Sequence, residues 1–148
     1  MHFPLFLSFT SILVESAGGV EVGRGIATGG AKLYFRHGAV SSAKTLSLLA
    51  AAHTYEVQQK KVVVIKPKLD TRFGNETVAS RAGLSRSADI LVVGDEMLPA
   101  EKFKDCQCVL VDEAQFLHPS IIDQLRDITI SHKIPVICYV SIFTTTVF

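Results

Sequence analysis

Three short runs of consecutive apolar residues stand out along the chain. They lie at Lys61–Lys66, Cys108–Val111 and Ile134–Val140, and they are rich in β-branched residues. Continuous apolar runs of this length, without alternation of polar positions, are typical of strands that a parallel sheet buries on both faces. The pattern therefore predicts three core strands in the region between residues 61 and 140.

Two other segments have the spacing of helices. Lys44–Gln59 is apolar around most of its circumference, which indicates a buried helix. A second helix begins at His118-Pro119-Ser120, because proline is favoured in a first turn and four apolar side chains follow at helical spacing: Ile121, Ile122, Leu125 and Ile128. A short strand at Lys32–His37 precedes the first helix. The chain thus contains two successive units in which a helix connects two strands. This order predicts an α/β fold with a mostly parallel sheet flanked by helices.

The segments between these elements are less decisive. Pro67–Gly74 is polar and is expected to be a loop, and Ser80–Ala88 is polar and ambiguous. Ile90–Val93 could add a strand, and Glu101–Phe103 begins a weak segment.

Both ends of the chain differ from its middle. Residues 1–30 combine an apolar run with a glycine-rich stretch, and three interpretations are open: a secretory signal, a native strand or arm, and a non-native leader. The first lacks a basic start, and the apolar run is too short to span a membrane. We favour the leader, because the features of the remaining residues, described below, weigh against export. Residues 141–148 suggest no cap, helix or site, so the expected domain covers residues 31–140.

Composition narrows the function classes. The formal net charge of +1 provides no strong field for nucleic acid or an anionic membrane. A hydrophobic fraction of 48% with 20% charged residues is that of a globular domain and excludes a wholly disordered chain. The three cysteines are too few for a disulfide framework, so we expect reduced thiols and a cytoplasmic location.

A candidate phosphate loop follows the first predicted strand. The stretch from Gly38 to Thr45 matches the pattern of glycine, four residues, glycine-lysine and a hydroxyl residue, except that Ala43 replaces the second glycine. Lys44 can reach nucleotide phosphates, Thr45 can ligate Mg²⁺, and the amides at the start of the helix attract anions. If position 43 requires a positive φ, alanine costs about 1–2 kcal/mol there.

An acidic pair follows the second core strand. Asp112 and Glu113 come directly after Val109-Leu110-Val111. An apolar strand that ends in a carboxylate is typical of the Mg²⁺ aspartate in phosphate-loop enzymes, and ligands bind at this edge of open α/β sheets. Since adjacent strand residues face opposite ways, one carboxylate could serve the metal shell and the other could act as a general base.

Taken together, residues 31–140 resemble the thymidine kinase family of the zinc-containing, phosphate-loop type, close to its bacterial branch. The segments that carry the resemblance are KLYFRHGAVSSAKTLSLL, KVVVIKPKLDTRFG, SRAGLS, CVLVDEAQFL and IPVICY. The resemblance implies a phosphate-loop NTPase fold and transfer of the γ-phosphate of ATP to the 5′-hydroxyl of thymidine, with Mg²⁺ as cofactor, and a homotetramer.

The resemblance also assigns roles to residues. It implies that Glu113 is the catalytic base, that Asp70 and Arg72 lie near the phosphates and metal, that Thr45 and Asp112 form the Mg²⁺ shell, and that Phe116 lies beside the nucleoside. For Phe116, simple core packing is an equally good explanation. The expected ATP-binding residues are Gly38, Ala39, Val40, Ser41, Ser42, Ala43, Lys44, Thr45, Asp112, Glu113, Ala114 and Gln115.

The chain also departs from the family. Beyond Tyr139 the family continues with a loop that covers thymidine and with a four-cysteine zinc site, and neither is seen in this sequence. We therefore expect the fold to lack the C-terminal zinc and lasso region, and we expect a truncated chain. A non-catalytic nucleotide-binding remnant of a thymidine kinase is the alternative function.

Overall fold

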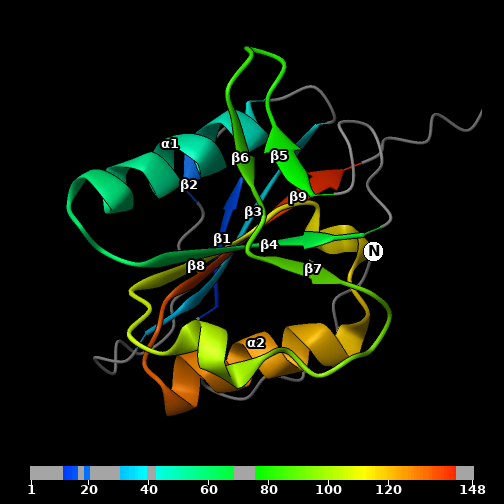
Figure 1. Cartoon of the computed structure of the whole chain (residues 1–148). Helices are drawn as coiled ribbons and strands as arrows, with labels where there is room; N and C mark the ends of the chain where they lie inside the picture. The colour runs from blue at the N-terminus through cyan, green and yellow to red at the C-terminus, as the bar shows by residue number, and fades with distance from the viewer. Residues whose placement is uncertain (1–11, 17–18, 21–30, 40–42, 69–75, 143–148) are drawn as a thin grey trace, which may run out of the picture.

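The computed structural model of the chain describes residues 12–16, 19–20, 31–39, 43–68 and 76–142. They form an α/β fold in which one sheet lies between two helices (Figure 1). The helices are α1 (Lys44–Val57) and α2 (Pro119–Ser131), and each covers a different face of the sheet. The α/β prediction, with a mostly parallel sheet flanked by helices, is confirmed.

The main sheet has seven strands in the order β2-β1-β3-β9-β8-β4-β7. Every neighbouring pair is parallel except β1 with β2. The strands are β1 (Ile12–Ser16), β2 (Gly19–Val20), β3 (Leu33–Ala39), β4 (Val62–Pro67), β7 (Ile90–Val92), β8 (Cys108–Val111) and β9 (Val136–Ile142).

A small antiparallel hairpin and two short 3₁₀ helices complete the described fold. The hairpin consists of β5 (Thr77–Ala79) and β6 (Ser85–Ser87), and it takes up most of the segment that was ambiguous in sequence. The 3₁₀ helices are η1 (Ala100–Phe103), at the weak segment noted above, and η2 (Ala114–Phe116).

The predicted core elements are present with shifted ends. The first helix ends at Val57 rather than Gln59, because Gln59 adopts a positive φ of 56°. Pro67 was assigned to a loop but is the last residue of β4, in register with Val92. At the end of a strand its missing N–H costs little.

Three strands, β1, β2 and β9, extend the sheet beyond residues 31–140, the expected domain. β9 runs two residues past Val140, because Ser141 and Ile142 pair with Gly38 and Ala39 at the end of β3. Within residues 1–30, β1 pairs in parallel with β3, from Ile12 opposite Leu33 to Ser16 opposite His37. The boundaries at residues 30 and 140 remain predictions.

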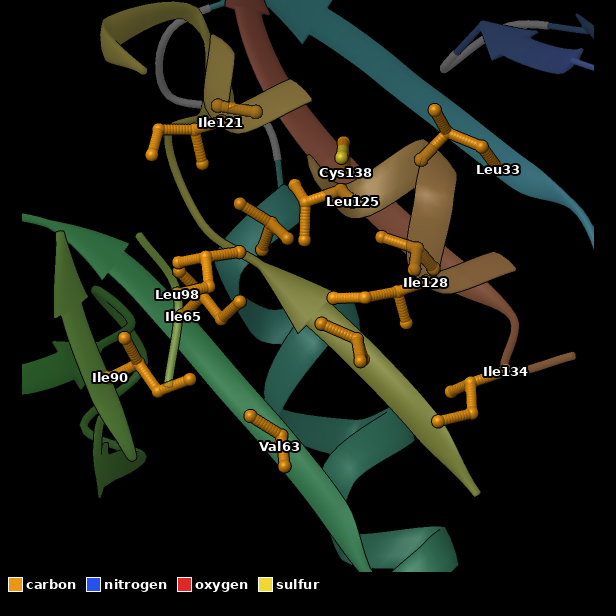
Figure 2. Packing of buried hydrophobic residues seen from close by; sticks show 14 of the residues in the cluster. Leu33, Val63, Ile65, Ile90, Leu98, Ile121, Leu125, Ile128, Ile134 and Cys138 are labelled. Carbon is orange, nitrogen blue, oxygen red and sulfur yellow. The ribbon is translucent and has the colours of Figure 1, made fainter. Parts of the chain in front are cut away.

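Alternate residues of the central strands feed two separate cores. Toward α2, Val63 and Ile65 of β4 pack with Val109 and Val111 of β8 and with apolar side chains of α2 such as Leu125 (Figure 2). Toward α1, the intervening residues of the same strands pack with Tyr139 and three helix residues: Leu48, Leu49 and Ala52. Strands buried on both faces explain why these runs lack polar alternation.

The three cysteines are free and buried. Burial raises the pKa of Cys108 to about 11, and it also raises the pKa of the fully buried Cys138 thiol. Near neutral pH both are therefore protonated apolar core residues rather than nucleophiles.

We expect the core beneath α2 to dominate stability. Leu125 has no exposed surface, so Leu125→Ala should lower the free energy of unfolding by about 2–5 kcal/mol through lost burial and the resulting cavity. Ile130 lies on the same helix with 49% of its surface exposed, and Ile130→Ala should cost less than about 1 kcal/mol. Urea denaturation of both variants checks this, and equal losses would contradict the packing described.

The buried thiols also predict how stability depends on pH. Above pH 9 the unfolded chain releases the Cys138 proton while the folded chain retains it, so stability falls as the pH rises. This thiol contributes a slope of about 1.4 kcal/mol per pH unit. Urea denaturation between pH 8 and pH 10 should show a shallower decline for Cys138→Ala than for the parent chain. Identical slopes would show that this thiol ionises equally in both states.

Candidate active site

The candidate site is built at the carboxyl ends of three neighbouring parallel strands. β9 lies between β3 and β8, so Gly38, Ser141 and Asp112 come to one edge of the sheet. Ligands of open α/β sheets bind at this edge, because the loops that leave the strands converge there. The two sequence motifs, 74 residues apart from Gly38 to Asp112, are thereby joined across a single intervening strand.

The lysine of the phosphate-loop motif lies at the first position of α1. Its Nζ donates a hydrogen bond to the carbonyl oxygen of Gly38 at 3.1 Å, so the lysine side chain folds back over the end of β3. The next residue, Thr45, is half-buried in the first turn. Among the described residues, this arrangement brings an ammonium group and the N-terminal amides of a helix to the same place, which suits an anion.

Ala43 does not have the backbone conformation that would penalise an alanine. It is the N-cap of α1 with φ −76° and ψ 31°, and its carbonyl accepts the first helical hydrogen bond from Ser47 N at 2.9 Å. Because φ is negative, the 1–2 kcal/mol penalty considered from the sequence does not arise here. Ala39 lies at the end of β3, whereas Val40, Ser41 and Ser42 of the motif lie outside the described residues.

The acidic pair lies directly beyond β8, and both side chains are buried. Asp112 N donates to Ile65 O at 2.9 Å, so the ladder between β8 and β4 continues by one residue past the strand. Glu113 then adopts left-handed backbone angles, φ 49° and ψ 46°, and begins η2. A non-glycine residue in this conformation stores strain of the order of 1–3 kcal/mol, which is found most often at functional sites.

Gln115 connects the acidic pair to β9. Its side-chain Nε2 donates to the Glu113 carboxylate, and its Oε1 accepts a hydrogen bond from Ser141 N at 3.1 Å. The glutamine amide therefore fixes the Glu113 carboxylate relative to the end of the neighbouring strand. The sequence indicated Gln115 as an ATP-site residue and suggested no role for Ser141, whose contribution is a backbone amide that no side-chain pattern signals.

Of the four remaining candidate site residues, two lie in the part of the chain that the structure describes and two lie outside it. Ala114 is buried within η2, and Phe116 at its end is 43% exposed. That exposure argues against simple core packing for Phe116 and leaves its ring accessible to a ligand. Asp70 and Arg72 lie outside the described residues.

One charged residue at this edge was missed from the sequence. Lys66 lies on β4, is 1% exposed, and donates from Nζ to Thr77 O at 2.6 Å. The signal was available, because a lysine ends the otherwise apolar run VVVIK, but the sequence analysis included it in a continuous apolar strand without a role of its own.

The donors at this edge suit a nucleotide-bound magnesium ion. Mg²⁺ is usually held by one or two carboxylates together with substrate phosphates and water, and Asp112 with Thr45 provides one carboxylate and one hydroxyl. Among the described residues, His, Cys, Asp and Glu form no group of three that could hold a metal alone. No helix within the described part of the chain is long and apolar enough to span a membrane.

Comparison with known proteins decides the family. A family model described as thymidine kinase matches residues 31–145, which is most of the chain and includes every candidate residue. The chain belongs to the thymidine kinase family. The match begins at the residue expected from the sequence and extends five residues past the expected boundary at residue 140.

Individual members of the thymidine kinase family are similar over about three-quarters of the chain. The chain is 42% identical over 111 residues to a thymidine kinase of Lactiplantibacillus plantarum. The aligned region covers 74% of this chain and 58% of that protein. It is 39% identical over 109 residues to one of Chromobacterium violaceum, covering 74% and 59%, and 39% identical over 113 residues to one of Enterobacteria phage T4, covering 74% and 58%. The chain thus spans about three-fifths of the length of these relatives.

The left-handed backbone of Glu113 predicts a difference between two substitutions. Glu113→Gly and Glu113→Ala both remove the carboxylate, but only glycine adopts φ 49° without strain. We expect the glycine variant to be more stable than the alanine variant by about 1 kcal/mol, measured by urea denaturation. An alanine variant of equal or greater stability would contradict the strained conformation.

Proposed function

We propose that this chain forms the nucleotide-binding core of a thymidine kinase, which transfers the γ-phosphate of ATP to the 5′-hydroxyl of thymidine. The observation that carries the proposal is the buried Glu113 carboxylate, held by Gln115 at the same sheet edge as Lys44. Membership of the thymidine kinase family supports this choice of reaction.

Positive charge for the phosphates comes from two sources in this proposal. Lys44 and the first amides of α1 lie at the end of β3, where the triphosphate would lie along residues 38–45. Asp70 and Arg72 form the second part of the phosphate and metal shell, as the family resemblance implies. Phosphoryl transfer depends mainly on such positioning and charge neutralisation, so most of the catalysis requires no covalent chemistry from the protein.

Magnesium would be held by Thr45 and Asp112 together with the phosphates. When bound, this ion neutralises charge that develops on the transferred group. The burial of Asp112 favours a fixed carboxylate over a solvated one, because few rotamers remain available to it.

Glu113 acts as the general base. Its carboxylate accepts the proton of the thymidine 5′-hydroxyl while that oxygen bonds to the γ-phosphorus, and the bond from phosphorus to the β,γ-bridging oxygen breaks to release ADP. The Gln115 amide orients the carboxylate by donating a hydrogen bond to it. Phe116 follows Gln115 in the chain and is exposed, and its ring would pack against the nucleoside.

A second function is favoured by one observation. The chain spans 58–59% of the length of the relatives cited above, so part of each relative lies outside the match. A nucleotide-binding remnant without kinase activity would retain the ATP half of the site. We therefore treat ATP binding and thymidine phosphorylation as separately testable.

The setting of the protein follows from the same proposal. Three buried, free cysteines favour a reducing compartment, and we place the chain in the cytoplasm. Its proposed substrates are ATP and thymidine, and a homotetramer is the assembly that the family resemblance implies.

The decisive experiment compares the parent chain with Glu113→Gln. The parent should melt at a higher temperature with Mg-ATP and should convert thymidine and ATP to dTMP and ADP. Glu113→Gln should lose at least about 100-fold in kcat, because its amide cannot accept the proton, yet should retain the Mg-ATP shift. Product formation measured by chromatography, alongside thermal melts, checks both results.

Glu101→Gln is the matched control, because Glu101 is exposed on η1 and lies outside the candidate site. It should leave both the melt and the turnover unchanged. A Mg-ATP shift without turnover in the parent would identify a nucleotide-binding remnant, and a cooperative melt without any shift would exclude the proposed ATP site.

A further inference from the structure

Lys66 is a charged residue in an otherwise apolar strand. The other residues of β4 are apolar and buried, and Lys66 itself is 1% exposed. Removing an ammonium group from water costs several kcal/mol unless nearby oxygen atoms or opposite charge compensate it. One compensating group is the carbonyl oxygen of Thr77, 2.6 Å from Nζ.

The strand register places Lys66 beside Asp112. Ile65 of β4 pairs with Val111 of β8, and Asp112 N donates to Ile65 O, so the next register position aligns Lys66 with Asp112. Ile65 and Val111 both belong to the core beneath α2. Because successive residues alternate between faces, Lys66 and Asp112 both lie on the opposite face, toward α1. Neighbouring strands of a sheet lie about 4.8 Å apart, so side chains at aligned positions on one face are neighbours.

Lys66 also reaches the start of the β5–β6 hairpin. Its partner Thr77 is the first residue of β5, so the hydrogen bond joins residues on either side of the segment that contains Asp70 and Arg72. The hairpin is attached separately through β6, where Arg86 bonds Glu56 of α1 at 2.8 Å and Asp89 at 2.9 Å. Arg86 thus attaches the hairpin at a distance from the site, whereas Lys66 attaches it at the site.

We infer that Lys66 is a positioning residue of the nucleotide site, which balances the charge of Asp112 and fixes the start of β5 at the carboxyl edge of the sheet. The contribution of Lys66 to nucleotide binding should be greatest when no Mg²⁺ accompanies the nucleotide. The Asp112 carboxylate then repels the phosphates, and Lys66 provides a fixed positive charge beside that carboxylate. The nucleotide part of this inference rests on the proposed function, whereas the coupling to Asp112 does not.

The first test is a double-mutant cycle without nucleotide. Unfolding equilibrium constants are measured for the parent, Lys66→Met, Asp112→Asn and the double variant. Each single substitution should raise the unfolding equilibrium constant by some factor. We expect the constant of the double variant to be about tenfold smaller than the product of the two factors would give, within the range measured for neighbouring groups. Additive effects would overturn the inference. If Lys66→Met alone does not melt cooperatively, recovery of a cooperative melt by added Asp112→Asn supports it, and no recovery counts against it.

The second test compares thermal shifts with ATP in EDTA and with Mg-ATP. Lys66→Met should lose more of the shift with metal-free ATP than of the shift with Mg-ATP, whereas equal losses would indicate a purely structural role. Lys61→Met is the matched control: Lys61 immediately precedes the amino end of β4, and it also donates to a carbonyl, that of Lys104 at 2.7 Å. A parent without any ATP shift, combined with a coupled cycle, would reject the proposed function while retaining the pairing.

Discussion

The parallel ladder that joins β3, β9, β8 and β4 is the constraint on which the site depends. Its register sets Gly38 opposite Ser141 and Ile65 opposite Val111, and it continues past Val111 because Asp112 N donates to Ile65 O. A slip of one residue in any of these pairs would turn every side chain of that strand to the other face. The apolar residues on both faces prevent such a slip, because alternate positions fill different cores. Packing far from the site therefore determines which groups meet at its edge.

Local backbone geometry then refines what the ladder brings together. Glu113 leaves β8 in a left-handed conformation, which ends the strand and starts η2. That turn brings Gln115 back to the edge, where its amide bonds both the Glu113 carboxylate and Ser141 N. The strain at Glu113 is sustained because the flanking residues are fixed by the core and by β9. In contrast, Ala43 is unstrained, so its substitution for glycine carries no conformational cost at that residue.

Buried charge is distributed unevenly in this fold. Toward α2 the core is apolar, whereas the carboxyl edge retains Lys66, Asp112 and Glu113 with at most 7% exposure each. Burying such groups costs stability, and proteins tolerate this cost mainly where function needs fixed charges. The concentration of these residues at one edge, beside Lys44, is consistent with a site that handles phosphate groups.

The sequence alone determined the fold class, the core strands and the two motifs. Continuous apolar runs and helical spacing are local signals, so the bounds of β8, the bounds of α1 to within two residues, and the start of α2 were predicted from the sequence. The two motifs were evident because a glycine, a lysine and paired carboxylates stand at recognisable spacings. Strand order and register could not be predicted from the sequence, because they depend on contacts between distant segments. Only the tertiary structure placed Ser141 against Gln115, paired Ile65 with Val111 at the ends of β4 and β8, and gave Ala43 a negative φ, since each of these follows from how strands and helix pack together.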